Sequence, residues 1–361
     1  MKQKYWICLS SAEQLDSVFI LSLYEYFGDI EQAFNCSKND LKNIEGLNIK
    51  KAEKFLSLRD KLNPDKTFEE IEKRGINVLT FDDERYPKML KEIHNPPAVL
   101  YYKGDLFSCN LDRTVAFVGS RRASSNGKDS VKKIIGDFKN TDICIVSGLA
   151  EGIDAASHRC AIDNNIKTIG VIASGFDYKY PSSSKDLYDK LVNGCGAIVT
   201  EYYPTFEPIK FRFPQRNRIV TGLSYGTVVG EAALKSGALI SANLTLEQGR
   251  ELMCIPGSIN NKNTEGVYKL LKSGATMVTS GEDVLNALNW EIDITGSKPE
   301  NNSTVNLAYS TLLDIINIEP LGFDEIQAKT GMDTDDLLKI LTMMEIEGFI
   351  EQTEGDRYKK S

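Results

Sequence analysis

The sequence predicts an α/β protein with a doubly wound, mostly parallel sheet, preceded by a helical domain and followed by a small winged-helix domain. Three observations lead to this prediction. Residues 113–289 alternate apolar strand segments with helical periodicity, residues 1–65 are helical in pattern, and residues 307–361 carry three helices followed by a hairpin. Between them, residues 290–306 are polar and rich in Asn, Gly and Ser, which is typical of a linker.

The composition is that of an ordinary globular protein, with 41% hydrophobic and 26% charged residues among 361. Its apolar runs fall short of the roughly 18 residues that a membrane-spanning helix needs. The N-terminal MKQKYWICLSSAEQ has no signal-peptide core, so we expect a cytoplasmic protein without membrane contact. Seven scattered cysteines without a C-x-x-C pair indicate free thiols in a reducing compartment. With only two histidines no metal site is expected, and no cofactor is expected either.

The N-terminal domain, residues 1–65, contains one recognisable motif. The stretch 41–56 resembles a helix-hairpin-helix element, in which a turn at Gly46 presents backbone amides beside Lys50 and Lys51. Such a turn can hold a nucleic-acid phosphate. The alternative is a small helical packing domain, and this is the interpretation that we prefer for a motif so short.

The central domain, residues 66–289, begins with a helix, FEEIEKRG, and two strands, INVLTF and AVLYY. The later strands are mostly continuous apolar runs, as expected when helices cover both faces of a sheet. They are Thr114–Gly119, Ile143–Ser147, Thr168–Ala173, Ala197–Glu201, Thr227–Glu231, Glu251–Ile255 and Thr276–Thr279. Loops at the carboxyl ends of parallel strands meet at one rim, so we expect the functional residues there.

The C-terminal domain, residues 307–361, is acidic. It carries twelve Asp/Glu and five Lys/Arg, a net charge of −7, which leaves −1 of the total −8 for the rest of the chain. Its third expected helix, MDTDDLLKILTMMEIEG, would enter the major groove in a DNA-binding winged helix, yet Lys339 is its only cation. We therefore expect this domain to dock a protein.

Two segments of the central domain are basic. Thr114–Lys139 and Pro208–Val220 each have a net charge of +4. Local basic patches, more than total charge, govern the binding of phosphate. These segments are therefore the first candidates for a phosphate-binding surface.

The first basic segment contains TVAFVGSRRASSNG, residues 114–127. A strand that ends in Gly119 and leads into a helix N-terminus attracts phosphate oxygens, and Arg121 and Arg122 add positive charge there. The stretch has neither the G-x-G-x-x-G spacing of a dinucleotide site nor the Gly-Lys-Ser/Thr of a P-loop.

The next strand ends in SGLAEGID, residues 147–154, and His158 follows. The glycines permit a tight turn and close approach of the backbone. A hydrolase triad of Ser147, Asp154 and His158 is one alternative. Because Ser147 lacks the G-x-S-x-G nucleophile elbow, we expect capping and packing roles instead.

The second basic segment contains KFRFPQRNR, residues 210–218, ahead of an expected helix at 219–223. Cations for phosphates and aromatic faces for bases are the usual combination in proteins that bind single strands. Of Phe211 and Phe213, we expect one to be buried and one to be available. The aromatic residues at the neighbouring strand ends could stack on bases or cover the sheet, and for each one we favour covering the sheet. These residues are Phe176, Tyr178, Tyr180, Tyr202 and Tyr203.

Together these motifs resemble the DprA/Smf family of DNA-processing proteins. The matching stretches are VGSRRASSNG, SGLAEGIDAASH, ASGFDYKYP, TEYYP, FPQRNRIVTGLS, EAALKSGALISA and GRELMCIPGS, in the family's order across about residues 70–285. The resemblance implies an extended Rossmann-like doubly wound sheet that binds single-stranded DNA without catalysis. It also implies a homodimer that protects incoming strands and loads the recombinase RecA onto them during natural transformation.

The resemblance also implies where DNA binds. The family's strand-binding pocket maps onto Gly119, Ser120, Arg121, Lys210, Phe213, Arg216 and Asn217. To these we add the neighbouring candidates Arg122, Ser124, Ser147, Gly148 and Arg218. The sequence departs from the family pattern at Asn126, Ser157 and Ser184, where Tyr, Ala and Asn are usual, which leaves the details of DNA preference open.

Two other functions remain open at this point. A Rossmann-like nucleotide-binding enzyme or sensor would use the same glycine-rich strand ends, and a hydrolase would need a carboxylate such as Asp154 or Glu201 over the phosphate. An assembly platform would work mainly through the acidic C-terminal domain.

Overall fold

The computed structural model divides the chain into two units, Met1–Ile294 and Thr295–Ser361. The residues that it describes are 2–292, 312–313, 315–316, 320–346, 349–353 and 357–360. In the described part of the chain no helix is both long and apolar enough to cross a membrane.

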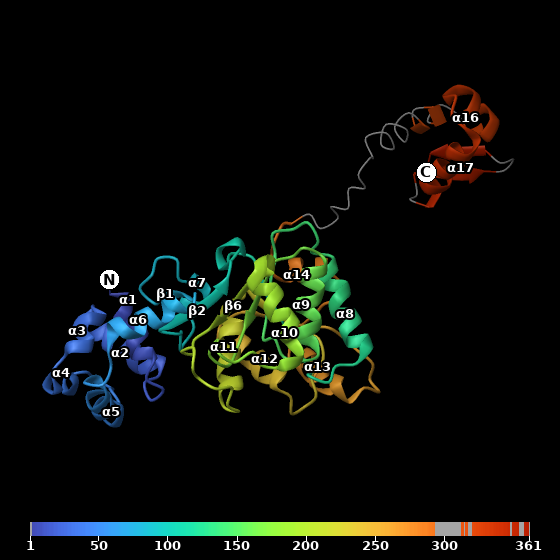
Figure 1. Ribbon diagram of the computed structural model, residues 1–361. Coiled ribbons are helices and arrows are strands. Elements are labelled where there is room, and N and C mark those ends of the chain that lie inside the picture. The colour runs from blue at the N-terminus through green and yellow to red at the C-terminus, as the bar shows by residue number, and fades with distance from the viewer. Residues whose placement is uncertain are drawn as a thin grey trace. The chain divides into compact units, whose positions relative to one another are not determined.

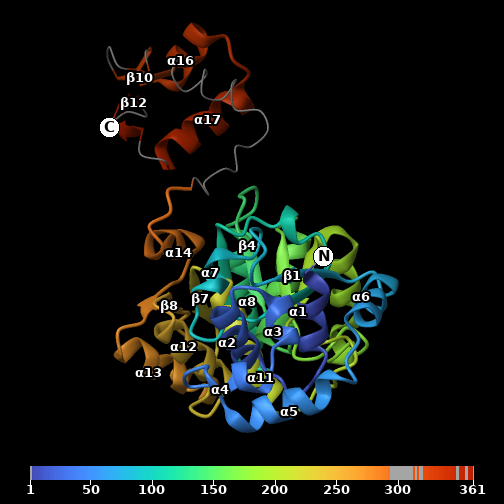
Figure 2. The same ribbon diagram turned by 90° about the vertical axis from the view of Figure 1, so that its left-hand side faces the viewer.

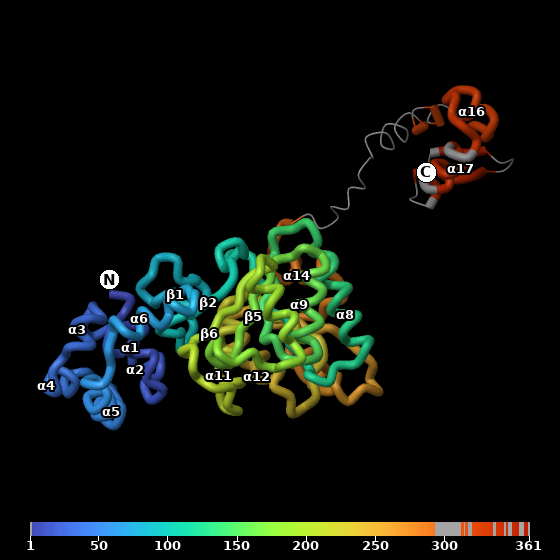
Figure 3. Tube along the Cα trace, in the orientation of Figure 1, coloured from blue at the N-terminus to red at the C-terminus, as the bar shows by residue number. Residues whose placement is uncertain are grey.

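The first unit opens with a group of helices, which confirms the predicted helical N-terminus. They are α1 (Gln3–Ser10), α2 (Ser17–Phe27), α3 (Ile30–Asn35), α4 (Lys38–Lys42), α5 (Ile49–Arg59) and α6 (Pro64–Lys73). Short polar side chains cap five of these helices by accepting a backbone N–H of the first turn. The capping residues are Asp16, Asp29, Ser37, Asn48 and Asn63. Figures 1 and 3 show these helices beside β1 (Asn77–Thr80) and β2 (Val99–Gly104).

The hairpin between α4 and α5 has the turn that the sequence predicts. Gly46 adopts φ +73°, in the left-handed region that favours glycine. Leu41 and Phe55 on either side of the turn are buried in the core of the helical group. The Lys51 ammonium is engaged with Asp16. These contacts describe a packed helical hairpin.

A nine-stranded sheet forms the centre of the first unit, in the order β1-β2-β6-β5-β4-β3-β7-β8-β9. The remaining strands are β3 (Thr114–Val118), β4 (Cys144–Ser147), β5 (Thr168–Val171), β6 (Gly196–Thr200), β7 (Gly226–Val229), β8 (Glu251–Cys254) and β9 (Thr276–Met277). β2 pairs antiparallel with both β1 and β6, whereas β3 to β9 are parallel to one another. The predicted doubly wound, mostly parallel sheet is confirmed.

Helices cover both faces of the sheet, as Figures 1 and 2 show. One layer contains α8 (Ser125–Gly136), α9 (Ile153–Asp163) and α14 (Gly281–Ala287), with α10 (Lys185–Lys190) beside α9. The other contains α11 (Arg212–Gly222), α12 (Gly237–Glu247) and α13 (Glu265–Lys272), with the short α7 (Lys88–Lys91) against α11. Along β3, Val115 and Phe117 pack into the first layer, whereas Ala116 and Val118 pack into the second. Burial on both faces explains why these strands read as continuous apolar runs.

One element differs from its prediction. The helix expected to begin at Ile219 begins at Arg212, so most of the second basic segment is helical. Pro214 is the third residue of α11, a position where the backbone N–H has no intrahelical acceptor, so the missing donor is tolerated.

The second unit contains β10 (Leu321–Gly322), α16 (Phe323–Thr330), α17 (Thr334–Ile346), β11 (Ile350–Thr353) and β12 (Arg357–Lys360), in the sheet order β10-β12-β11. In its core, Ile326 packs with Leu337, Leu341 and Ile350. The described residues of 312–316 are helical, as expected for the first helix. The predicted linker from 293 onward and the predicted hairpin turn at 354–356 lie outside the described residues.

Candidate nucleic-acid interface

The turn that follows β3 is fixed by close packing of its backbone. A Cβ on Gly119 would lie 2.4 Å from the nearest atom of α9, so no larger residue fits without a shift. Ser120 N donates a hydrogen bond to Glu231 O at 2.7 Å, which joins the turn to the segment after β7. The next two side chains, Arg121 and Arg122, are exposed at this edge of the sheet.

Ser124 is the N-cap of α8 and is held by a buried carboxylate. Its hydroxyl accepts the backbone N–H of Gly127 at 3.0 Å, and its own N–H donates to Glu231 Oε2 at 2.9 Å. The hydroxyl also donates to Glu231 Oε1, which receives a further bond from Asn261 Nδ2 at 3.0 Å. Ser124 therefore acts as a helix cap that fixes the turn, and its hydroxyl is already used.

Arg216 of α11 is buried where β4 and β5 end. Its Nη1 donates to Gly148 O at 2.5 Å and to Val171 O, and its Nε donates to Asn217 Oδ1 at 3.3 Å. A Cβ on Gly148 would lie 2.7 Å from the guanidinium, which explains the glycine. Among the described residues, Nη2 of Arg216 has no hydrogen-bond acceptor. This nitrogen is the donor that remains for a ligand.

A buried carboxylate accompanies this buried cation. Asp154 of α9 is 7% exposed and accepts the N–H of Gly148 at 3.2 Å. Burial raises the pKa of the Asp154 carboxyl, and the charge of Arg216 opposes this shift. Burial likewise lowers the pKa of the Arg216 guanidinium, and the charge of Asp154 opposes that shift. An arginine stays protonated at neutral pH, so the site keeps a cation in a fixed position.

Next to Arg216, a cation and two aromatic rings come together from three distant segments. The Arg121 guanidinium lies over the Phe213 ring, 5.5 Å from its centroid, and the Phe213 and Tyr180 centroids are 5.5 Å apart in an edge-on arrangement. Tyr180 is 50% exposed, unlike Phe176, so the expectation that each such aromatic residue covers the sheet is wrong for Tyr180.

The expectation for the two phenylalanines of the second basic segment is confirmed for one ring only, since Phe211 is available but Phe213 is not buried. Phe211 is 57% exposed and Phe213 is half-buried, so neither is a core anchor. The buried side chain between them is Arg212, which is held by Glu207 O and Glu13 and stacks against aromatic rings. The helical geometry of α11 turns Arg212 away from the rim and leaves both rings accessible.

Two adjoining pockets collect most of the predicted site residues, and we call them the rim pockets. The larger, of about 430 Å³, is lined by seven of them, Gly119, Ser120, Arg121, Arg122, Gly148, Arg216 and Asn217. The smaller, of about 100 Å³, is lined by Phe213 together with Arg121, Gly148 and Arg216, which the two pockets share. The structure thus brings the two basic segments together at the predicted edge.

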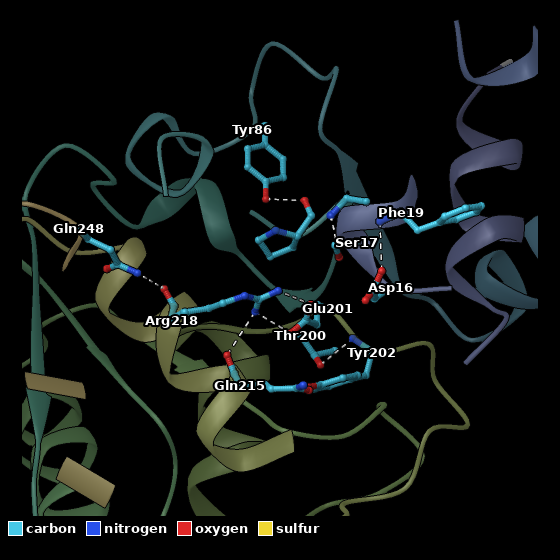
Figure 4. A network of polar contacts seen from close by, with 12 residues as sticks. Asp16, Ser17, Phe19, Tyr86, Thr200, Glu201, Tyr202, Gln215, Arg218 and Gln248 are labelled. Carbon is cyan, nitrogen blue, oxygen red and sulfur yellow. Dashed lines mark hydrogen bonds and ion pairs between the residues drawn. The ribbon is translucent and has the colours of Figure 1, made fainter. Parts of the chain in front are cut away.

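Arg218 lies elsewhere. As Figure 4 shows, its guanidinium faces Glu201, with two bonds of 2.7 and 2.6 Å, and its backbone carbonyl accepts a hydrogen bond from Gln248. Only 17% of the Arg218 side chain and 10% of the Glu201 side chain are exposed. Burial lowers the pKa of Arg218, but Glu201 outweighs this effect and leaves the pKa raised. The pair lines a different cavity, of about 450 Å³, beside Asp16 of the helical group, so we leave Arg218 out of the rim surface.

Ser147 and Lys210 also stand apart from the rim pockets. Ser147 is fully buried and donates to Phe117 O at 2.6 Å, so its hydroxyl holds β4 to β3. Lys210 is exposed just before α11 but lines neither pocket. Ser147, like Arg218, is therefore left out of the proposed contacts, whereas Lys210 remains available at the surface.

The three residues of the alternative hydrolase triad make other contacts. Ser147 bonds to Phe117, as described, and Asp154 accepts the backbone of Gly148. His158 Nδ1 lies 2.7 Å from Thr168 Oγ1, whose own hydroxyl donates to a backbone carbonyl, so Nδ1 is the donor. Burial lowers the pKa of His158 to about 3, so the imidazole is neutral. Packing roles explain all three.

Several residues of the rim pockets were not predicted. Among them are Tyr180, Ser236, Ser241 and Asn263. Asn263 Nδ2 donates to Arg122 O at 2.9 Å, which ties the rim turn to a loop more than a hundred residues later. Ser236 precedes α12 and lies in EAALKSGALISA, one of the stretches that resemble the family. This resemblance was the signal in the sequence by which residues of that stretch could have been assigned to the site.

Comparisons with known proteins identify the family. The family model described as "DNA recombination-mediator protein A" matches residues 77–289, and the model described as "DprA winged helix domain" matches residues 297–356. The first match alone covers more than half of the chain.

This chain belongs to the DprA/Smf family. It is 45% identical over 203 residues to DNA processing protein DprA of Streptococcus pneumoniae, covering 56% of this chain and 71% of that protein. The crystal structure of DprA from S. pneumoniae matches with a TM-score of 0.68 and 37% identity, over 80% of this chain and 97% of that one. DNA processing protein A from Helicobacter pylori, whose structure was reported for its single-stranded DNA binding mode, matches with a TM-score of 0.53 and 29% identity, over 59% of this chain and 95% of that one. The predicted extended Rossmann-like fold with a C-terminal winged helix is confirmed.

Proposed function

We propose that this DprA/Smf protein binds single-stranded DNA along the rim pockets and acts as a recombination mediator without catalysing a reaction. The observation that carries the proposal is the meeting of Arg121 with the Phe213 ring directly beside the buried cation Arg216. Cations bind the phosphates, and an aromatic face stacks on a base whatever its sequence.

The shape of the surface supports a polymer over a mononucleotide. The two rim pockets adjoin and share Arg121, Gly148, Ala150 and Arg216, so one strand passing over Arg121 would occupy both. Glu201, one of the carboxylates that a hydrolase would use, is paired with Arg218 in another cavity. The single-stranded DNA binding of the H. pylori relative also supports the proposal.

The proposal extends to partners and location. A recombination mediator passes DNA to a recombinase, and we propose that this chain forms a homodimer and loads RecA in natural transformation, as the family resemblance implies. The acidic domain of residues 307–361 is proposed to dock a protein. Free cysteines, six of seven buried, fit a reducing compartment, so we propose a cytoplasmic location.

The test is Arg121→Ala, with Arg113→Ala as the matched control. Arg121 follows the carboxyl end of β3, whereas Arg113 precedes its other end and pairs with Asp142, so both changes remove one solvent-accessible arginine. Each phosphate neutralised on a single strand contributes about −0.7 to the slope of log affinity against log salt. Arg121→Ala is expected to weaken oligothymidylate binding and flatten the slope by about 0.7, and the control is expected to match the unmodified protein.

Fluorescence anisotropy at several salt concentrations measures both quantities. Equal affinity and equal slope for Arg121→Ala and the unmodified protein would overturn the rim assignment. Thermal unfolding of both variants shows that the fold is retained, because surface substitutions usually change stability by less than about 0.5 kcal/mol.

A further inference from the structure

A second basic hollow lies between α8 and α9, outside the rim pockets. It has a volume of about 350 Å³, and we call it the α8–α9 groove. Lys128 and Lys132 line it from α8, one helical turn apart on the same face, and Arg159 lines it from α9. Three cations from two helices therefore surround one shallow cavity.

The floor of the α8–α9 groove is made of small residues. Gly152, Ala155 and Ala156 line it together with the cations, and Ser183 and Ser184 add hydroxyls. Small side chains leave the space over them open, so the long basic side chains border a trough. A trough bordered by three cations over small side chains suits a chain of phosphates.

The acidic residues near the groove do not neutralise it. Asp129 pairs with Lys132 at 3.0 Å and Asp186 lies 3.6 Å from Arg159, but neither acid lines the cavity. All four side chains of these pairs are about half exposed. Such surface pairs contribute only about 0–1 kcal/mol to the stability of the folded protein. A phosphate can therefore replace either acid at little cost.

One carboxylate, Glu151, does line the groove. It accepts a hydrogen bond from Ser183 Oγ at 2.7 Å, and it is exposed. Lys128 has no ion pair within the described part of the chain. The lining therefore has three cations against one carboxylate.

The groove continues directly from the rim pockets. Glu151 lines both the groove and the smaller rim pocket. Gly152, which also lines the groove, packs against the turn that carries Arg121, because a Cβ there would lie 2.0 Å from Ser120 O. A strand that leaves the smaller rim pocket past Glu151 therefore enters the groove that Lys128 and Arg159 line.

We propose that the α8–α9 groove holds the phosphate backbone of the nucleotides that continue beyond the rim pockets on the same single strand. This inference rests on the proposed function, since it needs a strand at the rim. It predicts that Lys128, Lys132 and Arg159 contact only strands long enough to extend past the rim.

The experiment compares a short oligothymidylate of about four nucleotides with a long one of about twenty. The test variant combines Lys128→Ala, Lys132→Ala and Arg159→Ala. The control combines Lys133→Ala, Lys139→Ala and Arg113→Ala, which removes the same charge from solvent-accessible residues that do not line the groove.

The test variant is expected to bind the short oligonucleotide like the unmodified protein and the long one more weakly. Three lost phosphate contacts flatten the salt slope for the long oligonucleotide by about 2. Between about 50 and 200 mM salt, its affinity should then fall roughly 20-fold less than that of the unmodified protein. The control is expected to keep the slope of the unmodified protein for both lengths.

Three results would overturn the inference. The first is an unchanged salt slope of the test variant for the long oligonucleotide. The second is an equal loss of affinity for the short and the long oligonucleotide, and the third is an equal loss of affinity in the test and control variants. Failure of the proposed function looks different, because the unmodified protein would then bind neither oligonucleotide. Thermal unfolding of the test variant confirms that any loss arises in the folded protein.

Discussion

Arg218 was expected at the DNA surface, but its contacts predict a structural role that can be measured. The perturbation is Arg218→Met, which keeps most of the apolar stem and removes the guanidinium. Glu201, only 10% exposed, then loses two bonds of 2.6–2.7 Å and remains as a buried charge without its partner. Breaking a buried pair in this way costs about 3–5 kcal/mol. At about 2 °C per kcal/mol for a unit of this size, Tm is expected to fall by about 6–10 °C.

The assay combines thermal unfolding with an oligothymidylate titration at several salt concentrations. Because Arg218 lines another cavity, the salt slope of Arg218→Met is expected to equal that of the unmodified protein. Replacing Glu201 by Met as well removes the unpaired charge, so the double variant should regain much of the lost stability. An unchanged Tm together with a flatter salt slope would show that Arg218 contacts phosphate and would refute this reasoning.

Two further predictions concern an aromatic ring of the rim and a buried imidazole. Phe213→Ala is expected to weaken oligothymidylate binding by about 1–3 kcal/mol, because the ring stacks on a base. Fluorescence anisotropy measures this loss of affinity. A variant in which only the salt slope changes would contradict stacking. For His158, burial lowers the pKa to about 3 in the folded chain, whereas the unfolded imidazole titrates near pH 6.5. Between about pH 3 and about pH 6.5 the unfolded state therefore binds a proton that the folded state does not bind. As the pH falls, His158 lowers the free energy of unfolding, by about 2 kcal/mol from about pH 7 to about pH 5. Urea unfolding at about pH 7 and about pH 5 should show that the free energy of unfolding falls less for His158→Gln than for the unmodified protein. An equal fall in the two proteins would contradict the prediction.

Local patterns were enough to predict the sheet and its rim. A strand buried on both faces must be apolar throughout, so β3, β4 and β5 could be found from residue type alone. The polar and glycine residues that follow them then had to lie at one edge, because the strands are parallel. The meeting of Arg121 with Phe213 follows from this geometry once the family resemblance pairs the two basic segments.

The errors arose where contacts between distant segments decide the outcome. The second basic segment gave no local sign that Arg212 and Arg216 turn inward, because their partners belong to other elements. The helix expected at 219–223 begins at Arg212, with Pro214 in its first turn, where a proline is tolerated. The partner of Arg218, Glu201, is likewise recognisable only in the folded chain.

The most direct test of strand binding at the rim titrates the unmodified protein with oligothymidylate, the equivalent duplex and a mononucleotide at two salt concentrations. We expect tight, salt-dependent binding of the single strand, weaker binding of the duplex, and no stabilisation by the mononucleotide in a thermal-shift measurement. Strong stabilisation by the mononucleotide, with no binding of the single strand, would contradict it and would favour a nucleotide-binding enzyme or sensor.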